Sequence, residues 1–392
     1  MFRLRALLFA TVPLLASFPA MAANFAVGTC KPRLTSFSTI SDAVASVPPG
    51  STIQVCPGVY PEQITISQPL TLQGIASGGQ DQIVITVPST PLSANVMSMF
   101  SEPVAAQLLV QSPGAVNITN VIVDGTGGDQ ACLTSTIWLA GIFYATGSSG
   151  EIDQVRTSGQ TNEGCGVGIW AENAGSSNRV VNIHDSSIHD VDGAGVFIGS
   201  GSTPTLTAFV RENFVSAPLG SEGVMVISVN GVVAQNNVTD TLAGIFDLAP
   251  GVRVSHNTVT NTQFGIVLLL GGTAESNDIS NSIFGIFLNA DGAVVQSNHI
   301  TLASSVGIEF NCHNGTVSHN TINDAALGLD QVPADFHGSN RFANTGLISS
   351  DGCSATPLVA GAARVQSPTG AQSGMSSPEH WRTPANPFGS RR

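Results

Sequence analysis

The sequence predicts an all-β protein built as a parallel β-helix, a solenoid in which each coil of the chain stacks on the coil before it. Three observations lead to this prediction. Glycine followed by a branched aliphatic residue or leucine recurs every 20–28 residues, and asparagine recurs in step with it. The 392 residues also include 42 Gly and 21 Pro, with only 10% charged residues, which favours strands and turns over helices. The recurring glycines are Gly141, Gly168, Gly195, Gly223, Gly244, Gly265, Gly285, Gly307 and Gly328.

The residues between the markers alternate with a period of two, as in "GIVLLL" and "NDIS", which is typical of short strands. Coils of a β-helix stack at about 4.8 Å, so equivalent residues lie above one another. Stacked amides can bond to each other and to the backbone, and glycine suits a corner where backbones approach closely or φ is positive. We therefore expect both columns to be structural. The asparagines are Asn213, Asn236, Asn257, Asn277, Asn298 and Asn320.

The stretch "FSTISDAVASVPPGSTIQVCPGVYPEQITISQPLTLQGI" (residues 37–75), together with the short repeats of about residues 115–335, resembles right-handed parallel β-helix proteins of the pectin-lyase-like superfamily. The resemblance implies a right-handed coil, which agrees with the handedness of parallel crossovers in general. It also implies a short N-terminal capping helix at about Ser38–Ser46. Such a helix would cover the exposed edge of the first coil.

The chain divides into four predicted regions. Residues 1–22 form a signal peptide, 23–75 the cap and first coils, 76–356 the β-helix coils, and 357–392 a tail rich in Ser, Pro and Gly that is expected to be disordered. Residues 90–113 break the repeat and are expected to form a loop or an insertion.

The N-terminus predicts export to the periplasm or the cell exterior. Arg3 and Arg5 precede the apolar run "ALLFATVPLLA", and "PAMA" places a cleavage site after Ala22. No segment of the mature chain is long and apolar enough to be a transmembrane helix. Six cysteines fit an oxidising compartment, and no CxxC or Cys/His spacing indicates a metal site. The proposed disulfides join sequence neighbours: Cys30–Cys56, Cys132–Cys165 and Cys312–Cys353.

Alternation within the strands also predicts an unusual outer surface. If the first residue after each glycine points inward, the second points outward, and most of these outward residues are apolar. Three interpretations remain open: a platform that stacks sugar rings, a face covered by the C-terminal tail or a long loop, and a protein interface. This outward column comprises Phe143, Trp170, Phe197, Met225, Phe246, Val267, Phe287, Glu309 and Asp330, and the proposed binding residues are Phe143, Trp170, Phe197, Met225, Phe246 and Phe287.

Candidate catalytic residues gather in "NIHDSSIHDVDGAG" (residues 182–195), near the longest coils. Carboxylates paired with each other or with imidazole can perform acid–base chemistry on a glycosidic bond. The alternative is that these polar residues simply occupy exposed turns. The sequence lacks the signatures of polygalacturonases, pectate lyases and pectinesterases. The candidates are Glu172, His184, His189, Asp190 and Asp192, with Asp185 beside them.

The net charge of the chain excludes some classes of ligand. A net charge of −13 argues against nucleic-acid binding and makes neutral glycans easier ligands than polyuronates. No cofactor is expected; calcium is possible, although no nonapeptide calcium repeat is present. The sequence does not specify an oligomeric state. It predicts an exported β-helix protein that binds, or binds and processes, extracellular carbohydrate. The alternatives are a polysaccharide lyase or glycoside hydrolase, and a non-catalytic envelope or surface interaction protein.

Overall fold

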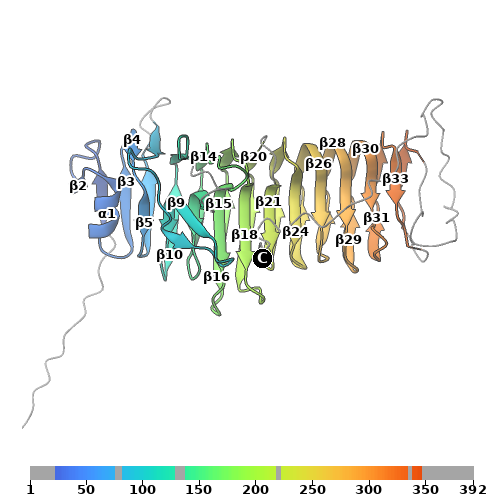
Figure 1. Ribbon diagram of the computed structural model, residues 1–392, viewed down its shortest axis with the longest axis horizontal. Helices are drawn as coiled ribbons and strands as arrows, with labels where there is room; N and C mark the ends of the chain where they lie inside the picture. The colour runs from blue at the N-terminus through green and yellow to red at the C-terminus, as the bar shows by residue number, and fades with distance from the viewer. Residues whose placement is uncertain (1–22, 76–81, 129–136, 218–221, 334–337, 347–392) are drawn as a thin grey trace, which may run out of the picture.

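The computed structural model describes residues 23–75, 82–128, 137–217, 222–333 and 338–346. These residues form an elongated solenoid whose strands run parallel from coil to coil, with α1 at the N-terminal end (Figure 1). The predicted right-handed parallel β-helix is confirmed. A coil contains a long strand, a strand of a second sheet and a short strand, as in β15, β16 and β17, before β18 begins the next coil.

One sheet has 13 strands. In spatial order they are β2 (Ser36–Phe37), β1 (Asn24–Val27), β3 (Ser51–Val55), β6 (Leu70–Gly74), β10 (Ala115–Thr119), β13 (Ser149–Asp153), β16 (Arg179–His184), β19 (Leu206–Arg211), β22 (Asn230–Ala234), β25 (Gly251–Ser255), β27 (Thr273–Glu275), β29 (Ala293–Gln296) and β31 (Gly315–Ser318).

The other sheet has 21 strands and holds both the long and the short strands of each coil, which become continuous in β26, β28 and β30. In chain order they are β4 (Gly58–Pro61), β5 (Ile64–Ile66), β7 (Ile83–Thr86), β8 (Val96–Met97), β9 (Pro103–Val110), β11 (Ile122–Asp124), β12 (Trp138–Tyr144), β14 (Arg156–Ser158), β15 (Gly166–Asn173), β17 (Ser187–His189), β18 (Ala194–Ser200), β20 (Phe214–Ser216), β21 (Glu222–Ile227), β23 (Asn237–Thr239), β24 (Ala243–Leu248), β26 (Thr258–Leu268), β28 (Asp278–Leu288), β30 (His299–Glu309), β32 (Thr321–Asn323), β33 (Leu327–Asp330) and β34 (Arg341–Ala343).

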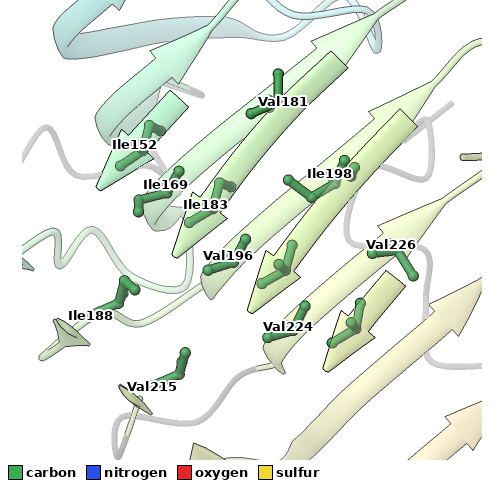
Figure 2. Close-up of a cluster of buried hydrophobic side chains, with 14 of the residues drawn as sticks. Ile152, Ile169, Val181, Ile183, Ile188, Val196, Ile198, Val215, Val224 and Val226 are labelled. Atoms are coloured by element: carbon green, nitrogen blue, oxygen red, sulfur yellow. The ribbon is translucent and has the colours of Figure 1, made fainter. Parts of the chain in front are cut away.

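Inward side chains of successive coils stack into one continuous core. Figure 2 shows Ile169, Val196 and Val224 on neighbouring long strands and Ile188 and Val215 on neighbouring short strands, and all five are fully buried. Branched aliphatic residues fill these positions because they pack closely on a pleated surface. The register that stacks them also stacks the outward residues of the same strands.

The repeated glycines lie at equivalent places in successive coils, as predicted. A Cβ on Gly244 would lie 2.7 Å from the carbonyl oxygen of Gly265, and a Cβ on Gly265 would lie 2.4 Å from that of Gly285. Both distances are too short for a real side chain. Close approach of the backbone, rather than positive φ, therefore explains this column.

The helix α1 (Ile40–Ser46) caps the N-terminal coil, close to the predicted range. Thr39 begins it by accepting a hydrogen bond from the Asp42 N–H at 3.0 Å, and the Glu62 carboxylate accepts one from the Ile40 N–H at 2.9 Å. Ile40 and Val44 are buried against the coil. The apolar face of the helix thus covers the end of the core.

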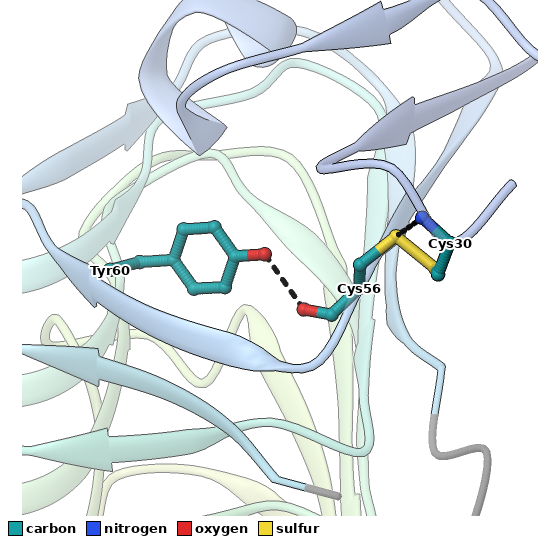
Figure 3. The surroundings of a disulfide bond; sticks show 3 residues. All are labelled: Cys30, Cys56 and Tyr60. Carbon is teal, nitrogen blue, oxygen red and sulfur yellow. Dashed lines mark hydrogen bonds between the residues drawn. A yellow bond between two sulfur atoms is a disulfide. The ribbon is translucent and has the colours of Figure 1, made fainter. Parts of the chain in front are cut away.

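Next to the cap, the predicted Cys30–Cys56 disulfide is confirmed (Figure 3). The Tyr60 hydroxyl donates to the Cys56 carbonyl at 2.7 Å. Cys165 and Cys312 are also disulfide-bonded. Their predicted partners lie outside the described residues, as do the predicted signal peptide and tail.

The interruption at residues 90–113 contains both an insertion and a regular strand. Its second half includes β9, which pairs in parallel with β12 and β5. The first half folds back so that β8 pairs antiparallel with β9. Among the described residues, no helix has both the length and the apolar character needed to cross a bilayer.

Candidate functional site

The outward column does point away from the coil interior, because its members form a hydrophobic cluster separate from the central core. These side chains are not exposed to solvent, however. Its apolar members are almost completely buried: Phe143, Trp170 and Phe197 at 0% exposed, Met225 at 2%, Val267 at 4%, Phe246 at 6% and Phe287 at 8%. An open sugar platform is therefore not present in this structure.

Residues 96–100 cover the N-terminal part of the column. The ring of Phe100 meets that of Phe197 edge-on with centroids 5.9 Å apart. Beneath this segment, the rings of Phe143 and Phe197 each lie 5.1 Å from that of Trp170. Val96 also packs against the cluster. Part of this column therefore packs against residues of the 90–113 interruption.

Glu172 lies on the same strand and face as Trp170, two residues further along β15. Its side chain is 2% exposed, and Oε1 accepts a hydrogen bond from the Met99 N–H at 2.9 Å. Oε2 makes no hydrogen bond of good geometry within the described chain. Burial raises the pKa of Glu172 to about 7, against smaller lowering effects of the Met99 N–H and the Trp170 side chain. The carboxyl group can therefore exchange a proton near neutral pH.

A groove of about 440 Å³ opens beside this segment. Met97, Ala145 and Arg179, the first residue of β16, are among the residues that line it. Ala145 follows Tyr144, which pairs with Ala171, so the groove reaches the strand position beside Glu172. The volume falls within the range of small-ligand sites.

His184 lies on the other sheet, at the end of β16, and is held between carboxylates. Its Nε2 lies 2.8 Å from Glu151 Oε1 and its Nδ1 lies 2.8 Å from Asp185 Oδ2. When both carboxylates are ionised they only accept hydrogen bonds, so this arrangement favours the protonated form of the ring. Burial lowers the pKa of His184, but the bonds to Asp185 and Glu151 and the charge of Asp153 outweigh it and raise the pKa overall.

The same cluster has metal-binding geometry. Ligand atoms of Asp153, His184 and Asp185 all lie within 4.8 Å of one another, close enough to share a cation. Burial is the largest cause that raises the pKa of Asp153, and the charge of His184 opposes it. A histidine nitrogen in the set suits a transition metal better than calcium, which prefers oxygen ligands.

His189 and Asp190 form a separate pair at the end of β17. Arg156 Nε donates to His189 Nε2 at 2.7 Å, so Nδ1 carries the proton and faces Asp190 Oδ2 at 2.6 Å. Asp192 has a structural environment: its carboxylate accepts hydrogen bonds from the Asn162 N–H at 2.6 Å and the Gly166 N–H at 2.8 Å. These bonds hold the loop that leads into β15.

The five predicted catalytic residues therefore do not form one constellation. Asp192 binds the start of β15 at Gly166, whereas Glu172 lies six residues further along that strand, about 20 Å away at the usual rise per residue. His184 belongs to the 13-stranded sheet and His189 to the 21-stranded sheet. The structure brings His184 together with Asp185, and His189 together with Asp190, as separate pairs.

The structure also shows a carboxyl pair that was not singled out for catalysis. Glu309 and Asp330 lie side by side on neighbouring strands at the C-terminal end of the outward column, after Phe287. Burial and the charge of Asp330 raise the pKa of Glu309 to about 7, and Gln331 Nε2 donates to its Oε1 at 3.2 Å. Both acids are half-buried. The signal was present in the sequence as two acids that end an apolar column.

No family model matches this sequence, and no curated protein does so either. Solved structures do share the fold. The GH136 lacto-N-biosidase from Eubacterium ramulus aligns with a TM-score of 0.53 and 10% identity over 83% of this chain and 68% of that chain. A mannuronic acid specific polysaccharide family 6 lyase from human gut microbiota aligns with a TM-score of 0.51 and 13% identity over 83% and 82%. The chain thus shares the right-handed parallel β-helix fold with these solved structures.

Proposed function

We propose that this protein is an exported carbohydrate-binding β-helix protein that holds a neutral glycan on the outer face of the 13-stranded sheet. The observation that supports this most directly is the position of His184, held between two carboxylates on a strand next to Phe209. The confirmed disulfide and the predicted signal peptide support export. The two fold neighbours named above act on glycans according to their names, which agrees with a carbohydrate ligand.

The proposed surface spans three neighbouring strands. Side chains on adjacent strands lie about 4.8 Å apart, and outward residues along one strand lie about 7 Å apart. Two rows of outward residues therefore form a compact patch. The first row is Glu151, Asn182 and Phe209, and the second is Asp153, His184 and Arg211.

The patch combines the two kinds of group that sugars require. Phe209 is half-buried and presents apolar surface, and the Arg211 guanidinium lies 5.3 Å from its ring centroid. Glu151 and Asn182 offer acceptors and donors for hydroxyl groups, while the His184 ring holds the carboxylates of Glu151 and Asp185 in place. The carboxylates around His184 would repel uronates, so the patch fits a neutral glycan better.

The test compares His184→Ala and Phe209→Ala with wild type by affinity electrophoresis in gels that contain xylan, glucomannan or β-glucan. Loss of one desolvated contact is expected to weaken binding roughly tenfold, because ~1.4 kcal/mol corresponds to a factor of ten. His299→Ala and Leu270→Ala are matched controls, since both side chains are exposed and lie in later coils. If all four variants migrate like wild type in every gel that retards it, this surface does not bind the glycan.

A second candidate function, hydrolysis of a glycosidic bond, is favoured by the Glu309–Asp330 pair. One carboxyl with a pKa near 7 beside a second carboxyl matches the acid and base roles in glycoside hydrolysis. Glu309→Gln is expected to abolish release of reducing ends from a bound glycan and to preserve binding. Asp278→Asn, at an exposed carboxylate, is the control. Undiminished product release by Glu309→Gln would remove this candidate.

A further inference from the structure

We infer that the groove beside β8 binds a small carboxylate with an apolar body, which is held by the guanidinium group of Arg179. The groove has a volume of about 440 Å³ and is open to solvent, so a ligand can enter without any movement of the chain. It lies where the long strands end and the chain turns towards the 13-stranded sheet. Residues 111–113 after β9, residues 145–147 after β12 and Arg179 at the start of β16 all line it.

Arg179 carries a charge that the described part of the chain leaves without an anionic partner. The protein has 26 acidic residues and 13 basic ones, yet no described carboxylate forms an ion pair with this guanidinium, and none lines the groove. Glu172 is 2% exposed, and its Oε1 accepts a hydrogen bond from the Met99 N–H. It therefore does not neutralise Arg179.

The hydrogen bonds of the Arg179 guanidinium are also incomplete. Its Nη1 donates to the Pro113 carbonyl at 3.5 Å, which is long for a hydrogen bond, and its Nε is buried without an acceptor among the described residues. A half-buried cation with unmet donors favours an anionic ligand. A carboxylate matches the planar fork of the guanidinium and can accept two parallel hydrogen bonds from it.

The walls of the groove favour an apolar ligand body. Val96, Met97, Pro113 and Ala145 supply apolar surface, and the Met97 side chain is 58% exposed. An apolar group that covers Met97 removes this surface from water, which adds to the attraction between the charges.

The polar side chains of the groove offer little to a sugar. Ser112 is 2% exposed, and its Oγ accepts a hydrogen bond from the Gly114 N–H at 3.2 Å. Thr146 Oγ1 accepts one from the Ala174 N–H at 3.2 Å. A sugar needs several polar groups directed at its hydroxyls, whereas a carboxylate needs mainly the guanidinium. The ligand class is therefore an aromatic or branched aliphatic acid.

This groove is separate from the glycan surface proposed above. Arg179 begins β16, whereas Asn182 and His184 lie three and five residues further along that strand. At the usual rise per residue these positions are about 10 and 17 Å from Arg179. The inference therefore does not rest on the proposed function.

Isothermal titration calorimetry with phenylacetate and isocaproate tests the inference. Phenylacetamide keeps the apolar body without the charge, and glucuronate keeps the carboxylate on a sugar. We expect one molecule of each apolar acid to bind, and both comparison compounds to bind at least tenfold more weakly. The inference is overturned if neither apolar acid binds, or if phenylacetamide or glucuronate binds as tightly as phenylacetate.

Two variants locate the binding site. Arg179→Gln should weaken phenylacetate binding at least tenfold, and Arg179→Lys should restore only part of the affinity because it lacks the planar fork. Met97→Glu leaves the arginine intact but places a negative charge in the groove, so it should also abolish binding. Arg253→Gln, at an exposed arginine in a later coil, is the matched control.

Phe209→Ala, which impairs the proposed glycan surface, should bind phenylacetate like wild type. Melting temperatures establish which variants are folded, and Met97→Glu decides the matter if Arg179→Gln does not fold. Wild-type affinity in either folded variant of the groove would overturn the inference. Loss of binding in Phe209→Ala or Arg253→Gln would do so too, because the acid would then bind elsewhere.

Discussion

At the scale of single residues, Asp247 is the least expected side chain in the structure. It occupies an inward column, where its register partners are Val226 and Leu268, and it is 0% exposed. Its Oδ1 accepts a hydrogen bond from the Ala249 N–H at 2.8 Å, whereas Oδ2 has no hydrogen-bond partner within the described chain. Burial raises the pKa of Asp247 to about 8, against the smaller effect of the Ala249 N–H. The folded protein therefore holds this carboxyl group mainly neutral at pH 7.

The Asp247→Asn variant should reveal this neutral carboxyl group through the pH dependence of the free energy of unfolding. Between the unfolded pKa near 4 and the folded value of about 8, the folded state keeps a proton that the unfolded state releases, so the free energy of unfolding falls as pH rises. The amide variant lacks this contribution. Relative to wild type, it should gain on the order of 2–5 kcal/mol in stability between pH 5 and pH 9, as measured by urea unfolding.

Asp278→Asn is the control for this measurement, because that carboxylate is exposed and its removal should leave the pH profile unchanged. Other buried acids also make the stability of the wild type depend on pH. The assignment is therefore tested by the difference in the free energy of unfolding between wild type and Asp247→Asn. A constant difference from pH 5 to pH 9 would contradict the assignment to Asp247.

At the scale of elements, the asparagine column holds one corner of the coil together. The Asn236 N–H and Nδ2 both donate to Asn257 Oδ1, at 3.0 and 2.9 Å, and Nδ2 also donates to the Val210 carbonyl at 2.9 Å. The pattern repeats from Asn213 through Asn320. These asparagines are 0–2% exposed, so each amide satisfies buried backbone groups that water cannot reach.

Asn257→Ala should therefore cost more than the loss of one hydrogen bond. The change removes the side-chain bonds to Asn277 Oδ1 and the Val233 carbonyl, and it deprives the Asn236 N–H and one Nδ2–H of Asn236 of their acceptor. We expect a loss of about 2–4 kcal/mol in the free energy of unfolding, measured by urea denaturation. Asn261→Ala, at an exposed side chain within β26, should cost less than about 1 kcal/mol. Equal losses at the two positions would show that burial of the column contributes nothing.

At the scale of the whole molecule, a solenoid has two ends where strands lack a neighbour. At the N-terminal end the described chain places α1 over the core, and the Cys30–Cys56 disulfide joins residues 26 apart beside it (Figures 1 and 3). The apolar residues Ile40 and Val44 are buried by this arrangement. The cap thus prevents the first coil from pairing with strands of another molecule.

Replacing Cys30 and Cys56 together with serine should loosen this end. Removing a disulfide that closes a loop of this size is expected to cost roughly 2–4 kcal/mol, which lowers the melting temperature. Exposed strand edges should then produce concentration-dependent association, detectable by light scattering during a thermal ramp. A variant that melts at the wild-type temperature and remains monodisperse would show that α1 alone secures the end.

The repeating part of this protein could be predicted from the amino-acid sequence alone. Glycine and asparagine recur at equivalent positions because each coil contacts the coil before it in the same way. The pattern therefore repeats every 20–28 residues along the sequence. Period-two alternation likewise determined that Trp170 and Phe197 point outward. The capping helix could be predicted from a short amphipathic stretch.

The contacts on the outer faces of the coils could not be predicted from the repeat. The cover over the outward column depends on a bond between Met99 and Glu172, which are 73 residues apart, and no repeat encodes such a contact. His184 and Asp192 are near each other in the sequence but lie in separate environments, because the chain turns between them. The local repeat in the sequence specifies the axis of the β-helix and which side chains point inward or outward. Contacts between distant, non-repeating segments specify which parts of those faces remain accessible.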